Sequence, residues 1–309
     1  MSTPRISVII PCRDEVVGLE RTLCSVIDQG YENIELLVAD GGSVDGSVEL
    51  IAEYAEHIAW WHSGPDTGPA DGVNLAMRHA TGEIVGILHA GDLYLPGALE
   101  AVIERMVGES RSDWVVGHGV RTDGQDGEQG RYDAVAPASP VSFLMHDTGQ
   151  LPTSAVFYRK SLLERHGPFD VRFRFAWSYE MHARLIIANR RPTVVGRLLV
   201  AHREDDRDND SINRTLRQGI EYIEVAERFG EHLPIKQQYA LWRNTDERRR
   251  IYALAEAEMK SGLARRQLWQ RLLRRPWWLA SPSYRRMLLH GTDSRDDKGH
   301  DHDQTRHAA

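Results

Sequence analysis

The feature that most constrains this chain is the alternation of two sequence periods over its first 120 residues. Short apolar, β-branched runs such as ISVII (6–10) and IVGIL (84–88) are separated by stretches that carry apolar residues at helical spacing. The runs are typical of strands buried on both faces, and the stretches between them are typical of helices with one apolar face. This alternation predicts an α/β fold in which helices flank a mostly parallel sheet.

The pattern predicts strands at 6–10, 34–39, 58–62 and 84–88. It predicts helices at 15–29, from the cap residue Asp45 through Ala55, at 69–80 and at 96–106. It then predicts an antiparallel pair of strands at 113–120 and 130–135, a strand in SAVFYR, and helices from Ser161 and at 178–189. Residues 212–290 are almost wholly helical in pattern, and the last 17 residues are too polar to bury a core. We therefore expect an α/β domain over 1–211, a helical extension over 212–292 and a disordered tail over 293–309.

Each of the first four predicted strands ends in a polar turn that contains glycine or proline. The four turns read PCRDE, DGGSVD, HSGPDTG and HAGD. Any one of them alone is best explained as a solvated loop. The carboxyl ends of parallel strands share one edge of a sheet, where ligands of such folds bind, so the four turns together predict a binding site at that edge.

The bulk properties exclude several classes of protein. The formal net charge is −7, whereas a dedicated nucleic-acid binder normally carries a basic footprint. The chain has only two cysteines, too few for a disulfide framework or a zinc site, which favours a reduced, cytoplasmic compartment. The N-terminal apolar run is too short for a signal peptide, and no run approaches the roughly 20 apolar residues of a membrane-spanning helix.

In this order and spacing, the motifs SVIIPCRDE, LLVADGGSVDGS, GPDTGPADGVNLAMRHATGEIVGILHAGD and GPFD followed by YEMHARL resemble family 2 glycosyltransferases of the GT-A fold. The resemblance covers about residues 5–211 and is nearest to the branch found in exopolysaccharide and lipopolysaccharide assembly. It implies a Rossmann-like sheet, a nucleoside-diphosphate sugar as donor, a divalent metal (Mg²⁺ or Mn²⁺) and an inverting single displacement.

The resemblance places the metal beside Asp92, just beyond the strand at 84–88. A divalent cation held by carboxylate oxygens neutralises the charge that develops on a departing diphosphate. Of the family's usual Asp-x-Asp-Asp motif, only the last carboxylate is present here, and we expect Asp92 to bind the metal and take part in catalysis. His89 is expected at the diphosphate or metal, and His202 as a late metal ligand; a structural role is an open alternative for both histidines.

The resemblance also implies the residues that bind the donor. Pro11 and Asp14 border the base, and Asp40 matches the first carboxylate of the family's DDGS turn, with Gly41 in place of the second. Asp66 is expected at the base or the ribose. Asp71 and Asn74 lie one helical turn apart and are expected to position the diphosphate or sugar. The expected donor-binding residues are therefore Pro11, Asp14, Asp40, Asp66, Asp71, Asn74 and His89.

An inverting transfer needs a carboxylate that takes the proton from the acceptor hydroxyl. In the family this carboxylate usually precedes the arginine of the R-L helix by six residues, but here that position is Ser178. Glu180 is the nearest carboxylate and is our expected base, although positions 178 and 180 lie about 200° apart on an ideal helix. The alternative is that Glu180 only supports the helix.

The extension carries eight Lys/Arg residues and no Asp or Glu between Lys260 and Thr292. Trp269, Trp277, Trp278 and Tyr284 are interleaved with them. This combination suits an anionic membrane surface, so we expect 260–292 to associate peripherally with the inner face of the cell membrane. The alternative is a helix packed on the catalytic domain with solvated arginines.

These observations together predict a cytoplasmic, metal-dependent glycosyltransferase with a nucleotide-sugar donor and a glycan or lipid-linked saccharide acceptor, in polysaccharide biosynthesis. Nucleic acid is not an expected partner. One alternative is a catalytically impaired GT-A domain that binds a nucleotide sugar or a partner enzyme. The other is a nucleotidyltransferase, for which PCRDEVVG is a poor phosphate loop.

Overall fold

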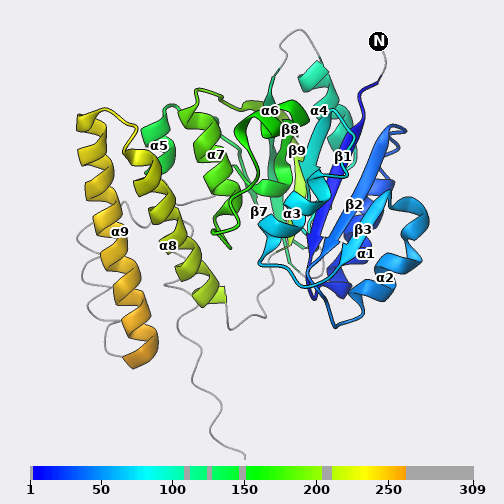
Figure 1. Cartoon of the computed structure of the whole chain (residues 1–309), viewed down its shortest axis with the longest axis horizontal. Coiled ribbons are helices and arrows are strands. Elements are labelled where there is room, and N and C mark those ends of the chain that lie inside the picture. The colour runs from blue at the N-terminus through cyan, green and yellow to red at the C-terminus, as the bar shows by residue number, and fades with distance from the viewer. Residues whose placement is uncertain (1–2, 108–111, 124–126, 146–150, 204–210, 262–309) are drawn as a thin grey trace, which may run out of the picture.

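The computed structural model describes residues 3–107, 112–123, 127–145, 151–203 and 211–261. Within these residues nine strands form one sheet in the order β3-β2-β1-β4-β8-β6-β9-β5, with β7 paired to β6. The strands are β1 (Ile6–Cys12), β2 (Ile34–Asp40), β3 (Trp60–Ser63), β4 (Ile84–Ile87), β5 (Leu93–Tyr94), β6 (Trp114–Thr122), β7 (Glu128–Tyr132), β8 (Val156–Arg159) and β9 (Thr193–Arg203). The predicted α/β fold with a mostly parallel sheet is confirmed (Figure 1).

The helices follow the strands in the expected alternation. They are α1 (Val16–Ile27), α2 (Ser47–Glu53), α3 (Pro69–Met77), α4 (Ala98–Val107), α5 (Pro140–Leu144), α6 (Lys160–His166), α7 (Trp177–Ile187), α8 (Ser211–Gly230) and α9 (Ile235–Ser261), with 3₁₀ turns η1 (Ala55–His57) and η2 (Thr153–Ala155). Strands β1, β2, β3 and β4 pair in parallel. Their carboxyl ends therefore point to the same edge, as the sequence predicted.

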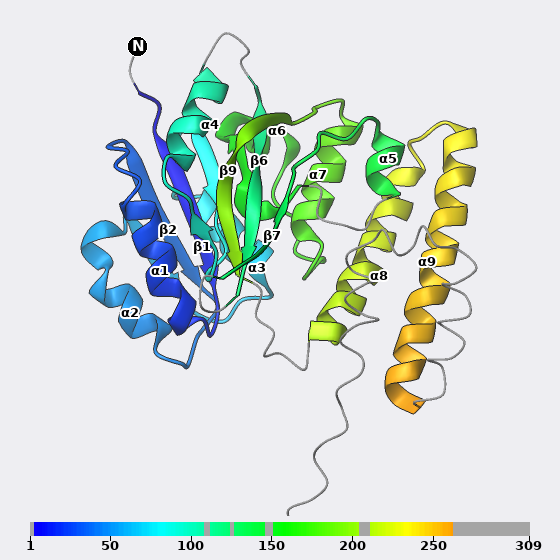
Figure 2. The ribbon, with the colours of Figure 1, turned by 180° about the vertical axis from the view of Figure 1, so that it is seen from behind.

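The sheet separates two hydrophobic cores because successive side chains of a strand point to opposite faces. Val8 and Ile10 of β1 pack with the helices α1, α2 and α4, whereas Ile9 packs with α3, α5, α6, α7 and α8. All seven residues of β1 are buried, which explains its continuous apolar run. Figure 2 shows the same layers from behind.

The sequence did not predict β5 and β9. β5 has only two residues, too few to show a period. β9 pairs with β6 through two register shifts around His118, and such irregularities interrupt the alternation of buried and exposed residues by which strands are recognised. The consequence is functional, because β9 carries His202.

α8 and α9 form an antiparallel pair that packs on α7 and α5, and α9 lies at one end of the long axis of the molecule (Figures 1 and 2). Among the described residues, no helix has the length and apolar character needed to cross a membrane. Most of the basic segment 260–292 lies outside the described residues, as does the tail 293–309.

Candidate active site

The four polar turns meet at the carboxyl edge of the sheet. The Val44 N–H donates to the Asp14 carboxylate at 2.9 Å, which joins the first turn to the second. A Cβ atom at Gly41 would lie 2.9 Å from Oδ2 of Asp66, so the second turn touches the third. A Cβ at Gly18 would lie 2.7 Å from the Cα of Gly91, so the start of α1 presses on the fourth turn. The turns thus form one continuous rim.

Asp40 organises the DGGS turn from the buried end of β2. Its carboxylate accepts hydrogen bonds from the N–H groups of Gly42 and Ser43, at 3.1 and 2.9 Å, and from the Ser63 hydroxyl at 2.6 Å. The Ser43 hydroxyl and, at 3.5 Å, the Cys12 thiol donate to it as well. Burial alone raises the pKa of Asp40, but these donors together hold it below its usual value. Both oxygens are therefore occupied in shaping the turn.

Asp14 lies on the first turn, as expected, whereas Pro11 still belongs to β1, just before the turn. Pro11 is buried in β1, and its carbonyl accepts from the Ala90 N–H at 3.5 Å. Asp14 adopts a left-handed φ of 52° and is exposed; its N–H donates to the Ser43 hydroxyl at 2.8 Å. Asp14 stabilises the contact between the first two turns.

Asp66 lies in the third turn, half-buried beside Gly41. Its Oδ1 accepts from the Gly68 N–H at 3.0 Å. Burial raises the pKa of Asp66 and the Asp71 carboxylate adds to this effect, while the Gly68 N–H and the guanidinium of Arg13 oppose it. The space that a side chain at position 41 would need is filled by the Asp66 carboxylate.

Asp71 and Asn74 both lie on α3 but serve different contacts. Asp71 Oδ2 accepts from the N–H and the hydroxyl of Thr67, both at 3.2 Å, and so caps the turn. The Asn74 side chain makes two hydrogen bonds to the backbone of Phe169, donating to its carbonyl at 2.8 Å and accepting from its N–H at 2.9 Å. Asn74 therefore ties the donor-side helix to the GPFD segment, about 95 residues farther along the chain.

Asp92 is buried at the centre of the rim. Its Oδ1 lies 2.8 Å from Nδ1 of His202 and accepts from the Arg203 N–H at 3.3 Å, and its Oδ2 accepts from the Ser154 hydroxyl at 2.5 Å. Burial alone raises the pKa of Asp92, but His202, His89 and the Ser154 hydroxyl together hold the carboxyl below its usual value. The structure thus brings together the two residues that the sequence assigned to the metal.

His89 is half-buried at the end of β4. Its N–H donates to the Ser154 hydroxyl at 3.2 Å, and its ring meets Trp177 edge-on with 5.7 Å between centroids. Burial lowers the pKa of His89 and favours the neutral imidazole. On the other side of Ser154, Thr153 donates to the Ser178 hydroxyl at 2.7 Å. Position 178 therefore faces the rim, as the family's base position requires.

Glu180 does not face the rim. Its carboxylate has no exposed surface and pairs with Arg184, and with Arg228 of α8 at 3.5 Å. Burial raises the pKa of Glu180 against the effect of both guanidinium groups. A fully buried, doubly paired carboxylate is poorly placed to reach an acceptor hydroxyl, which favours the alternative that Glu180 supports the helix. The physical reason is the helical period, because Ser178 and Glu180 point to different sides of a regular first turn.

Three further residues support the site without a signal in the sequence. Thr22 of α1 donates to the carbonyl of Asp92 at 2.9 Å and accepts from the Gly91 N–H at 2.9 Å, so one hydroxyl fixes the fourth turn. Ser154 joins Asp92 to the backbone of His89. Their partners are about 60 to 70 residues away along the chain, a separation at which no local motif forms.

Glu221 of α8 is the third of these residues. Its carboxylate accepts from three successive backbone N–H groups, those of Arg174, Phe175 and Ala176, at 3.2, 2.7 and 2.7 Å. These groups lead into α7, where a carboxylate is favoured by the unpaired donors of a helix start. α8 therefore positions the first turn of α7, with Trp177 and Ser178, at the rim.

Asp92 and His202, the two residues predicted to bind the metal, are in contact. Within the described segments, no group of three or more His, Cys, Asp or Glu gathers in a metal-binding arrangement. Nδ1 of His202 faces Asp92, so a metal held by this ring would bind Nε2. A carboxylate that fixes the ring of a histidine is the usual support of a metal-binding imidazole, and the pair fits a metal that takes its other ligands from the diphosphate and water.

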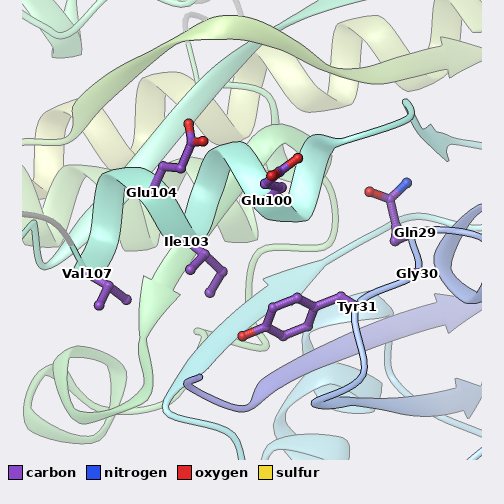
Figure 3. Close-up of a pocket in the computed structure, with 7 residues that line it drawn as sticks. All are labelled: Gln29, Gly30, Tyr31, Glu100, Ile103, Glu104 and Val107. Atoms are coloured by element: carbon purple, nitrogen blue, oxygen red, sulfur yellow. The ribbon is translucent and has the colours of Figure 1, made fainter. Parts of the chain in front are cut away.

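A separate pocket lies between α4 and the segment that follows the C-terminal end of α1 (Figure 3). Tyr31 borders it and bonds through its hydroxyl to the carbonyl of Pro4, at the amino end of the strands. Its lining residues are Gln29, Gly30, Tyr31, Glu100, Ile103, Glu104 and Val107. None of the predicted site residues lines this pocket, so it is distinct from the rim.

Solved structures with a similar fold are glycosyltransferases of the GT-A type. The mannosyltransferase PcManGT from Pyrobaculum calidifontis, in complex with GDP-Man and Mn²⁺, aligns with a TM-score of 0.61 at 18% identity, over 93% of this chain and 86% of that one. The S. aureus TarS 1–349 structure with UDP aligns with a TM-score of 0.56 at 14% identity, over 84% and 92%. The chain spans only 42% of the longer TarS structure. The fold is therefore that of GT-A glycosyltransferases.

The sequence matches the family model "Glycosyl transferase family 2" over residues 7–173, and the chain belongs to this family. An uncharacterized glycosyltransferase of Mycobacterium tuberculosis is 32% identical over 182 residues, which cover 58% of this chain and 68% of that protein. A PGL/p-HBAD biosynthesis glycosyltransferase of Mycobacterium bovis is 27% identical over 188 residues, with 60% and 70% covered. The family model includes all four polar turns and ends before α7.

Proposed function

We propose that this family 2 glycosyltransferase moves a sugar from a nucleoside-diphosphate sugar to a hydroxyl of a glycan or lipid-linked acceptor, with inversion, in the assembly of cell-surface polysaccharide. The observation that carries the proposal is the meeting of four turns around the Asp92–His202 pair at the carboxyl edge of the sheet. The structures of similar fold that hold UDP, UDP-GlcNAc or GDP-Man support a nucleotide-sugar donor.

We assign the metal, Mg²⁺ or Mn²⁺, to the Asp92–His202 pair. His202 would hold the ion through Nε2, while Asp92 orients the ring through Nδ1. When bound, the ion supplies positive charge that offsets the charge of the departing diphosphate. The Mn²⁺ in the mannosyltransferase structure is consistent with such an ion. Asp92 thus acts on the metal through His202 rather than as an isolated ligand.

On the donor side, the contacts divide the expected residues into two groups. The side chains of Asp40, Asp14 and Asn74 are hydrogen-bonded to other parts of the protein, so we assign these residues to shaping the rim. Asp66 lies half-buried where the second carboxylate of the DDGS turn would be, and we assign it to the base or ribose. His89, whose N–H rather than its ring bonds to Ser154, is assigned to the diphosphate.

A second function is favoured by one observation. The family's base position is Ser178, and the nearest carboxylate, Glu180, is buried in ion pairs. A chain without a base would bind a nucleotide sugar without transferring it. We keep this binding module as the alternative to an active enzyme.

The test is release of nucleoside diphosphate from a panel of nucleotide sugars, with Mg²⁺ or Mn²⁺ and a membrane lipid extract as the source of acceptor. Wild type, Asp92→Asn, His202→Ala and Glu180→Gln are assayed together, and donor binding is measured by calorimetry. Metal-dependent release that Asp92→Asn and His202→Ala strongly reduce and Glu180→Gln preserves supports the proposal. Tight donor binding without release, with acceptor present, supports the binding module instead.

We also propose a cytoplasmic location at the inner face of the membrane, where lipid-linked acceptors are found. The basic and tryptophan-rich composition of 260–292 supports this location.

A further inference from the structure

The outer face of α9 exposes large apolar side chains where a surface helix normally carries polar ones. Ile235, Tyr239 and Trp242 are 82%, 61% and 59% exposed. Their spacing of four and three residues places them on one side of the helix, and the rings of Tyr239 and Trp242 lie 5.9 Å apart. The opposite side, which includes Leu241 and Ile251, is buried.

Positive charge accompanies this apolar stripe. Lys236 and Arg243 are exposed and directly follow Ile235 and Trp242, so both cations flank the apolar stripe along one edge. Four basic residues between 235 and 253 are exposed: Lys236, Arg243, Arg249 and Arg250. Arg249 pairs with Glu227 and Arg250 with Asp246, whose side chain is 39% exposed, so the positive charge of this face comes from Lys236 and Arg243. This local charge contrasts with the net charge of −7 of the whole chain.

We propose that this α9 face, defined as Ile235, Lys236, Tyr239, Trp242 and Arg243, docks on a membrane surface that contains anionic lipids. Tyr and Trp rings favour the boundary between water and hydrocarbon, where one end is apolar and the other is wet. Lys and Arg beside them are attracted to anionic headgroups. The face needs no insertion across the bilayer, because it lies along the surface of a helix whose other side is packed on the protein.

Two further observations favour a lipid surface as the occupant. α9 is the outermost helix at one end of the molecule, and in both views its outer side is free of other described elements (Figures 1 and 2). The chain then continues into 262–292, which combines arginines with Trp269, Trp277 and Trp278. A second copy of the chain fits less well, because a twofold contact through this face would bring the cations of both copies together.

The experiment is co-sedimentation of the full chain with vesicles of phosphatidylcholine alone or of phosphatidylcholine with an equal share of phosphatidylglycerol. We expect binding to the anionic vesicles only, weakened by salt. The variant Tyr239→Ser/Trp242→Ser should lose about tenfold or more of this binding, since each ring buries a large apolar surface. Trp61→Ser, an exposed tryptophan (38%) on β3, is the matched control and should bind as wild type does.

Circular dichroism and thermal unfolding show whether each variant is folded, and light scattering gives its mass. Unchanged vesicle binding in the double variant overturns the proposal, as does a loss of binding in Trp277→Ser/Trp278→Ser alone. A change of oligomeric mass with unchanged vesicle binding would identify a second copy as the occupant. The assay contains no donor or acceptor, so its outcome is independent of the proposed reaction.

Discussion

The donor side of the sheet and the side covered by α7 and α8 both hold carboxylates at their contacts, but the partners of these carboxylates differ. On the donor side, Asp14, Asp40 and Asp66 accept hydrogen bonds from backbone N–H groups and serine hydroxyls. On the other side, Glu180 and Asp170 pair with guanidinium groups of Arg172, Arg184 and Arg228, which come from different elements. The first kind of partner shapes a loop, whereas the second ties helices together.

This difference predicts different consequences of mutation. A carboxylate that shapes a loop affects ligand binding more than folding, because the loop lies at the surface. A buried carboxylate between two arginines affects folding more than chemistry, because its loss removes the negative charge that compensates theirs. The following experiments test this division, beginning with the largest effect.

Glu180→Ala should cost about 3–5 kcal/mol in the free energy of unfolding, since Arg184 and Arg228 then lose a buried partner. Urea unfolding measures this cost, and turnover per folded molecule should remain at the wild-type value. Glu164→Ala removes an exposed partner of Lys160 and is the control, with an expected cost below about 1 kcal/mol. Wild-type stability together with lost turnover would instead make Glu180 the base.

Asp92→Asn should lower donor turnover by about 10- to 100-fold, because the amide no longer fixes the His202 ring as a carboxylate does. Nucleoside-diphosphate release at saturating donor measures the effect, and the loss of stability should be smaller than in Glu180→Ala. Asp246→Asn on α9 is the control and should retain full activity. Unchanged turnover in Asp92→Asn would exclude the Asp92–His202 pair from catalysis.

His182 should make the protein sensitive to mild acid. It is buried against Trp114 and Tyr158, and burial lowers its pKa to about 3. In the unfolded chain His182 has a pKa near 6.5, so below this pH it binds a proton that it does not bind in the folded chain. The contribution of His182 to the free energy of unfolding is therefore complete above pH 6.5 and falls as the pH drops toward 3. The expected slope is about 1.4 kcal/mol per pH unit at most.

Chemical unfolding of wild type and His182→Gln between pH 7.5 and pH 5 isolates this effect, since most carboxylates stay ionised in this window. The glutamine variant should be less stable at neutral pH but should show a flatter pH profile. Parallel profiles would show that another group is responsible.

Gly41→Ala should have the smallest effect. Its Cβ would lie 2.9 Å from Oδ2 of Asp66, so the carboxylate must move. We expect donor affinity to fall roughly fivefold, or about 1 kcal/mol, with stability almost unchanged. Gly196→Ala on β9, where nothing lies within 4 Å of the added Cβ, is the matched control. Equal affinities in both variants would argue against a role of Asp66 at the base or ribose.

The same division explains what the sequence could predict. The turns of the donor side are formed by residues that are neighbours in the sequence. The glycines and carboxylates in DGGS or GPDTG therefore indicate both the turn and its position after a strand. The parallel strands before them were equally clear from their apolar runs. The fold and the gathering of the turns therefore followed from short-range patterns.

The other half depends on partners far apart in the chain. His202 reaches Asp92 only because β9, with its shifted register, runs beside β6 and β5. Glu180 was expected as the base because it is the carboxylate nearest to Ser178 in the sequence, but its side chain pairs with Arg184 and with Arg228 of α8, a partner that no local pattern reveals. Thr22, Ser154 and Glu221 belong to ordinary helices and turns, and only tertiary contact makes them important.

The three hydrogen bonds that Glu221 accepts have a practical consequence for anyone who prepares a shorter protein. A fragment that stops at residue 211, where the α/β domain was expected to end, would lack the carboxylate that holds residues 174–176 and the guanidinium of Arg228. Trp177 and Ser178 would lose their support, so the minimal working unit must extend at least through α8.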